Sequence, residues 1–140
     1  HHEDTNDVMQ NVFVKVWRHL GNFRQESSLF TWLYRIGTNE SLTYLEQQKK
    51  KRSLSLSDHE TSLSNRVRAE KNFDGTKVEW KLQLAIQTLP EKQRAVFTLR
   101  YYDEMPYEQM SEVLDTSVGS LKASYHHAAK KVEAFILAEN

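Results

Sequence analysis

The chain has 140 residues, and its 19 lysines and arginines are balanced by 19 aspartates and glutamates, so net charge alone gives no sign of a nucleic-acid partner. It contains no cysteine, which excludes disulfides, thiolate zinc sites and cysteine nucleophiles and agrees with a reducing cytoplasm. No apolar run approaches the length of a membrane span, and the first residues do not resemble a signal peptide. We therefore expect a cytoplasmic protein without membrane insertion, built as one domain or two very small ones.

Residues 4–48 predict two helices joined by a polar connection. In the first helix, valines recur at Val8, Val12 and Val16, with larger apolar side chains beside them. Residues 21–28 form the polar connection, and Ser28 can cap the second helix, whose apolar positions begin at Leu29. Two helices of this length cannot bury a sufficient core alone. We therefore expect this module to be incomplete, with a further helix before His1.

Residues 49–77 predict a linker. The chain is basic from Lys49 to Arg52, then rich in serine, and its hydrophobic periodicity is weak. A short helix is expected over residues 66–71. Helical periodicity returns at Val78 and runs up to Pro90, and a further helix is expected from Glu91 to Tyr102.

Residues 105–131 predict a helix, a tight turn and a second helix. Pro106 supplies a preset φ at the start of the first helix, which spans residues 107–114. Asp115 lies where the chain must turn, and aspartate tolerates positive φ better than most side chains. Either Thr116 or Ser117 can cap the second helix. The expected buried positions are Met110, Val113 and Leu114 on the first helix, and Val118, Leu121, Tyr125 and Val132 on the second.

The second of these helices carries a basic surface. Residues 116–132 contain three lysines, two histidines and no carboxylate. A helix-turn-helix with such a surface is typical of proteins that place a helix in a DNA groove. Since no segment of useful length shows the strand period, the predicted class is all-α, with two small helical modules joined by a flexible linker.

Three segments in order resemble bacterial sigma factors of the extracytoplasmic-function (ECF) type. The family's region 2.2, which docks on the clamp of the polymerase β′ subunit, is similar to EDTNDVMQNVFVKVWRHLGNF. Regions 2.3 and 2.4, which melt and read the −10 promoter element, are similar to FTWLYRIGTNESL. Region 4, whose helix-turn-helix reads the −35 element, is similar to LPEKQRAVFTLRYYDEMPYEQMSEVLDTSVGSLKASYHHAAKKV. The resemblance implies a partial region 2 over residues 1–50, a linker over 51–77 and a four-helix region 4 over 78–140.

The resemblance implies three groups of binding residues. Contacts to core RNA polymerase are expected from Asp7, Gln10, Asn11, Phe13, Val14 and Trp17, although Phe13 and Trp17 can equally be core residues. Contacts to −10 DNA are expected from Phe23, Arg24, Ser27, Ser28, Trp32, Arg35 and Asn39. Of these, Trp32 fits a core position better than a stacking platform, whereas the Asn39 amide suits a base edge. Contacts to −35 DNA are expected from Ser117, Ser120, Lys122, Ala123, Ser124, His126, His127 and Lys130.

This last group departs from the family's usual pattern. Positions 124, 127 and 129 often carry arginine, whereas this chain has Ser124, His127 and Ala129. Fewer cations mean fewer phosphate contacts and weaker binding by this module alone. His126 and His127 can read bases or pair with phosphates, but adjacent helical residues point about 100° apart, which argues against a chelating metal pair.

The predicted function is therefore that of a transcription initiation factor, not an enzyme, that needs no cofactor or metal. Its expected partners are promoter DNA and core RNA polymerase, through the β′ clamp and the β subunit, and an anti-sigma factor is a further candidate. The alternative is a stand-alone helix-turn-helix regulator with an N-terminal sensing or dimerising module. An enzyme lacks support, because the chain has no phosphate-cradling glycine-rich loop and no HExxH motif. The cluster of His1, His2, Glu3 and Asp4 is terminal, and the two histidines are either native or the remnant of a tag.

Overall fold

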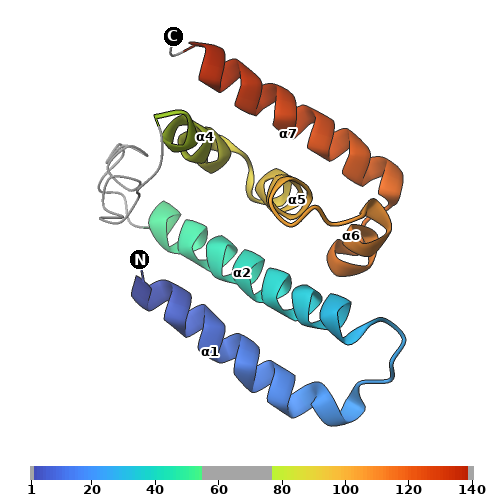
Figure 1. Ribbon diagram of the computed structural model, residues 1–140. Helices are drawn as coiled ribbons and strands as arrows, with labels where there is room; N and C mark the ends of the chain where they lie inside the picture. Colours follow the sequence, from blue (N-terminus) through green and yellow to red (C-terminus); the bar gives the residue numbers. More distant parts are fainter. Residues whose placement is uncertain (1, 55–76, 139–140) are drawn as a thin grey trace. The chain divides into compact units, whose positions relative to one another are not determined.

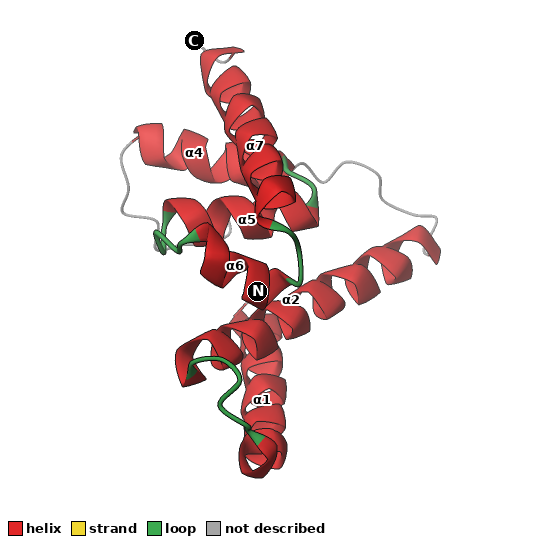
Figure 2. Ribbon diagram, turned by 90° about the vertical axis from the view of Figure 1, so that its right-hand side faces the viewer, coloured by secondary structure: helices red, strands yellow, loops and turns green. Residues whose placement is uncertain are grey.

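The computed structural model describes residues 2–54 and 77–138, and these residues form helices joined by short loops, with no strand among them (Figures 1 and 2). The predicted all-α class is confirmed. The predicted short helix over residues 66–71 lies outside the described residues, as does most of the predicted linker. The helices belong to two compact units: unit 1 holds residues 1–55 and 105–121, and unit 2 holds residues 56–104 and 122–140.

Unit 1 begins with two long helices that pack against each other, α1 (His2–His19) and α2 (Leu29–Leu54), with a short 3₁₀ helix, η1 (Leu20–Asn22), between them. The valines Val8, Val12 and Val16 are the half-buried side of α1. An ion pair between Lys15 and Glu40 joins the two helices. α2 does not end near Gln48, as the sequence predicts, but continues to Leu54, so the basic residues Lys49 to Arg52 are helical.

Ser28 caps α2, as the sequence predicts. Its Oγ accepts a hydrogen bond from the backbone N–H of Thr31 at 3.1 Å, and the hydroxyl donates to the Thr31 Oγ1 at 2.9 Å. This side chain satisfies one of the N–H groups that the first turn of a helix leaves without an intrahelical partner.

Unit 1 also contains α6 (Tyr107–Leu114), which packs against α2. The Gln109 amide donates a hydrogen bond to the Thr31 hydroxyl at 3.2 Å, and Thr31 is buried. The Arg35 guanidinium donates to the backbone carbonyl of Glu112, through Nε at 2.8 Å and also through Nη2. A neutral carbonyl receives both donors, so this contact does not neutralise the charge of Arg35.

The turn after α6 is built as the sequence predicts. Asp115 adopts the left-handed conformation, with φ 48° and ψ 50°, and its conformation ends the helix. The next helix, α7 (Val118–Ala138), is capped by Ser117, whose Oγ accepts the N–H of Ser120 at 3.2 Å. Thr116, the other candidate cap, instead donates its hydroxyl to the carbonyl of Leu114 at 3.0 Å. Of the positions predicted to be buried, Met110, Val113, Leu121 and Val132 are buried, whereas Leu114, Val118 and Tyr125 are only half-buried.

Unit 2 is held by a core that α4 (Lys77–Thr88), α5 (Glu91–Tyr101) and α7 share. Phe97 lies at its centre and stacks on Tyr125, with ring centroids 5.7 Å apart, and on Tyr101, at 5.2 Å. Ala128 is completely buried, and so small a side chain lets neighbouring helices approach closely. The core consists of Ala85, Ile86, Leu89, Phe97, Ala128 and Val132.

Arg94 closes the turn between α4 and α5. Its guanidinium donates to the carbonyls of Gln87 at 3.0 Å and Leu89 at 3.1 Å, at the end of α4 where carbonyls lack helical partners. Burial lowers the pKa of Arg94, because the charged guanidinium is partly removed from water. The two hydrogen bonds that the guanidinium donates offset part of this desolvation cost.

The left-handed turn predicts that two substitutions of Asp115 affect the free energy of unfolding to different extents. Asp115→Gly should change the free energy of unfolding by less than about 1 kcal/mol, since glycine takes positive φ without steric cost but gains entropy when unfolded. Asp115→Val should lower it by about 1–2 kcal/mol, because a β-branched side chain clashes in this conformation. Urea unfolding followed by circular dichroism measures both changes. The control is Glu108→Val in right-handed α6, and an Asp115→Val loss no larger than the control's contradicts the role of the turn.

Candidate functional site

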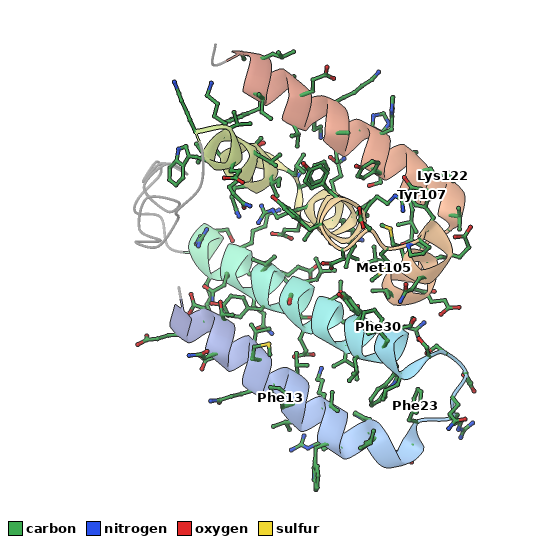
Figure 3. The ribbon with its side chains drawn as sticks, in the orientation of Figure 1. Phe13, Phe23, Phe30, Met105, Tyr107 and Lys122 are labelled. Atoms are coloured by element: carbon green, nitrogen blue, oxygen red, sulfur yellow. The ribbon has the colours of Figure 1, made fainter. Side chains whose placement is uncertain are left out.

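One face of α1 is exposed, and we refer to it as the α1 face. All six residues that the sequence predicts to contact polymerase lie exposed on it: Asp7, Gln10, Asn11, Phe13, Val14 and Trp17. Phe13 is 64% exposed and Trp17 is 83% exposed, so neither aromatic belongs to a core formed by the described residues. Figure 3 shows Phe13 on α1. Large exposed aromatics beside amide side chains are typical of a protein-binding surface.

The loop between α1 and α2 brings together two of the residues predicted to bind −10 DNA. The ring of Phe23, labelled in Figure 3, lies 5.0 Å from the ring of Trp32, and the two planes are tilted by 45°. Both residues are half-buried, so Trp32 is neither a fully buried core residue nor a free stacking platform. Arg24 and Asn39 are exposed. The pair therefore forms a partly open aromatic surface next to a cation.

Three other residues of this group are engaged within the protein. Ser28 caps α2 with its hydroxyl. Ser27 is half-buried, and its hydroxyl makes only a long contact of 3.4 Å to the Ser28 carbonyl. Arg35 is bound to the Glu112 carbonyl of α6. These hydrogen bonds orient the exposed guanidinium of Arg35 and leave its other N–H donors for DNA.

The side of α7 opposite its buried residues carries most of the residues predicted to bind −35 DNA, and we refer to it as the outer face of α7. Exposed residues of this group are Ser117, Ser120, Lys122, Ala123, His126, His127 and Lys130, and Ser124 is half-buried. The Ser117 hydroxyl is used as the helix cap and also donates to the Ser120 Oγ at 2.9 Å. The hydroxyl of Ser117 is therefore committed to the start of the helix, and the lysines and histidines are the larger polar groups of this face.

Two further surfaces have no residues among those predicted to bind. The end of α2 carries four consecutive cations that are all helical and exposed: Lys49, Lys50, Lys51 and Arg52. Its charge is visible in the sequence, but the length of helix that carries it is not. Unit 2 has an apolar groove lined by Leu82 of α4, Phe97 and Tyr101 of α5, and Tyr125, Val132 and Ile136 of α7. Periodicity identifies these positions as apolar but cannot tell a groove wall from a filled core.

The comparisons with known proteins concern both parts of the chain. Residues 1–51 match the family described as "Sigma-70 region 2", and residues 79–132 match "Sigma-70, region 4". The ECF RNA polymerase sigma-E factor of Haemophilus influenzae is 30% identical over 138 residues, covering 93% of this chain and 73% of the relative. The RNA polymerase sigma-H factor of Pseudomonas aeruginosa is 27% identical over 139 residues, covering 94% of this chain and 72% of the relative.

A solved structure shows the same fold. The sigma factor RpoE of Bartonella quintana, in complex with the anti-sigma factor NepR, aligns with a TM-score of 0.74 at 18% identity, over 99% of this chain and 84% of that chain. The chain belongs to the extracytoplasmic-function sigma factors of the sigma-70 family. It is a transcription initiation factor that directs RNA polymerase to promoters. Among the residues that the structure describes, no helix is long and apolar enough to cross a membrane.

The cap at the start of α2 gives a test of what Ser28 does. Ser28→Ala should lower the free energy of unfolding by about 1 kcal/mol, because the Thr31 N–H loses its acceptor. Ser28→Asp keeps an acceptor and should retain most of the stability. The control is Ser27→Ala, with an expected change within about 0.5 kcal/mol, measured by urea unfolding. Equal stability of the two alanine variants would show that the Ser28 hydroxyl is not needed as a cap and is free for DNA.

Proposed function

We propose that this chain docks on core RNA polymerase through the α1 face and recognises promoter DNA through the α1–α2 loop, α2 and the outer face of α7. The observation that carries the proposal is the exposure of Phe13 and Trp17. Leaving two large aromatics in water forgoes roughly 1.5–3 kcal/mol of burial each, so their exposure suits a surface that a partner covers. The partner for this face is the β′ clamp of the polymerase.

The apolar groove of unit 2 is proposed as the contact with the β subunit. Its walls come from three helices, and Tyr101 on α5 is 49% exposed. Tyrosine is favoured at protein interfaces, because its ring is apolar while its hydroxyl can stay hydrated. An amphipathic helix of the partner is the kind of segment that such a groove accepts. An anti-sigma factor, which the related Bartonella structure contains, is a competing occupant of the same polymerase-binding surfaces.

The DNA-facing part of unit 1 suits an opened −10 element. Arg24 follows Phe23 in the chain and is exposed, so the loop combines the Phe23–Trp32 pair with a cation, as single-strand binding requires. Asn39 is exposed on α2, where its amide can pair with a base edge. The cations Lys49 to Arg52 continue along the same helix and supply charge for the phosphate backbone. We propose this helix as the path of the −10 DNA.

The proposed organisation is a partial region 2 over residues 1–50, a linker over 51–77 and region 4 over 78–140. The activity is recognition and assisted melting of the promoter. No chemical step is assigned to the chain, so we propose that it is not an enzyme. Its site of action is the bacterial cytoplasm, where polymerase and promoter DNA are found.

The α1 face is tested by binding to bacterial core RNA polymerase on a sizing column. The full chain should co-elute with the polymerase, and the Gln10→Ala/Trp17→Ala variant should bind at least about tenfold more weakly, since buried aromatic anchors are worth about 2 kcal/mol or more. Its circular dichroism should be unchanged, because both side chains are exposed.

The matched control is Phe30→Ala, which removes an aromatic that is 58% exposed on α2 and lies outside the α1 face. The control should co-elute like the parent chain. If the double variant co-elutes as well as the control, the α1 face is not the docking surface. If the parent chain itself does not co-elute, the proposal that this chain docks on core polymerase through the α1 face is wrong.

A further inference from the structure

The outer face of α7 carries two adjacent histidines with no recorded hydrogen bond or ion pair among the described residues. His126 and His127 are both exposed, and their ring centroids lie 6.0 Å apart. Lys130 follows His126 by four residues and His127 by three, so helical spacing places its ammonium between the two rings. Lys122 precedes His126 by four residues, and Figure 3 labels it near the start of α7. The histidines therefore lie within a row of cations.

No carboxylate lies beside the two imidazoles on their own helix. Asp115 precedes α7, and the first carboxylate after the histidines is Glu133, two turns beyond His126. In unit 2, α7 buries Ala128 and Val132, with Tyr125, Ala129, Phe135 and Ile136 packed beside them, whereas both histidines are exposed.

Two helices, α4 and α5, share the core of unit 2 with α7 and pack against the side that carries Ala128 and Val132. Between α5 and α7, the Lys131 ammonium donates a hydrogen bond to the Gln93 Oε1 at 3.1 Å. The charged residues of these two helices are Lys77, Glu79 and Lys81 on α4, and Glu91, Lys92, Arg94 and Arg100 on α5. The outer face thus presents its imidazoles to solvent among lysines.

We propose that His126 and His127 bind backbone phosphates of promoter DNA as imidazolium cations, so that DNA binding strengthens and becomes more salt-dependent as the pH falls. This inference rests on the proposed function, because it requires the outer face of α7 to meet DNA. It specifies that function further by assigning the two histidines to phosphates and not to base edges.

The chemistry favours phosphate as the ligand. A neutral imidazole offers one N–H donor, whereas an imidazolium offers two donors and a full positive charge. Two imidazolium ions with ring centres 6.0 Å apart repel each other in the free protein, and a phosphate between or beside them removes that repulsion. Protonation and DNA binding therefore strengthen each other. A metal ion fits this pair of histidines less well than phosphate does, because no third metal-ligating side chain joins them among the described residues.

The sign and size of the effect follow from counterion release. Histidine changes charge between about pH 5 and pH 8, so the two contacts are present at the acidic end of that range and lost at the alkaline end. Each phosphate contact contributes about 0.9 to the slope of log K against log salt concentration, so two contacts steepen the slope by about 1.8. Across a fourfold change in salt this amounts to roughly a tenfold additional loss of affinity at low pH.

The experiment measures binding of the full chain to a fluorescently labelled DNA duplex of about 25 base pairs and arbitrary sequence, because phosphate contacts are independent of sequence. Fluorescence anisotropy gives the dissociation constant between about 50 and 200 mM salt, at about pH 6 and about pH 8. The slope should be steeper at the lower pH. Circular dichroism at both pH values shows that the chain stays folded.

Three variants separate the histidines from other causes. His126→Gln/His127→Gln should show the shallow slope at both pH values, because glutamine cannot take up a proton. His126→Lys/His127→Lys should show the steep slope at both. His19→Gln, which changes an exposed histidine on α1, should behave like the parent chain.

The outcomes distinguish this inference from the proposed function. DNA binding with the same slope at both pH values, or a pH dependence that survives in the His126→Gln/His127→Gln variant, overturns the inference and leaves DNA binding by the chain intact. Loss of the pH dependence in His19→Gln alone also overturns it, because the proton would then be taken up on α1. No binding to the duplex at low salt at either pH overturns the inference, whereas co-elution with core RNA polymerase remains the separate test of the proposed function.

Discussion

The burial of one side of α7 is the constraint on which the DNA-facing surface depends. In unit 2, Ala128 and Val132 pack with Phe97 and the end of α4, and this packing fixes the rotation of the helix about its own axis. Once that rotation is set, helical geometry decides that His126, His127 and Lys130 point away from the core. The completely buried Ala128 allows this close packing, because a larger side chain would hold the helices apart.

The fold leaves exposed aromatic side chains on α1 and neighbouring cations on the outer face of α7. Phe13 and Trp17 remain in water although burying them would be favourable, and the outer face of α7 gathers cations that repel one another. Both features cost free energy in the isolated chain, and both costs are relieved by a partner of the matching chemistry, a protein surface for the aromatics and a polyanion for the cations. The free-energy cost of these surfaces in the isolated chain is therefore recovered when a partner binds them.

Arg35, in contrast, is a candidate DNA-binding residue that already makes hydrogen bonds within the protein, to α6. Its guanidinium donates two hydrogen bonds to one neutral carbonyl, which is a weaker acceptor than a phosphate. Such a contact orients the side chain in the free protein without holding it as an ion pair would. Where DNA takes the two N–H groups that face α6, it replaces hydrogen bonds and not an ion pair, and the free energy of those hydrogen bonds is about 1–3 kcal/mol.

The sequence by itself determined the features that depend on neighbours along the chain: the helical class, the span of α6, the Ser28 and Ser117 caps and the left-handed Asp115 turn. These features are local, because a cap or a turn is made within about four residues of the side chain that specifies it. The tertiary structure decided which apolar residues find a neighbour. Periodicity marks Phe13, Trp17 and Tyr125 alike as apolar, yet the first two are exposed while Tyr125 packs on Phe97. Only contacts between residues distant in sequence, such as Arg35 with Glu112, could settle which candidate side chains are free to bind.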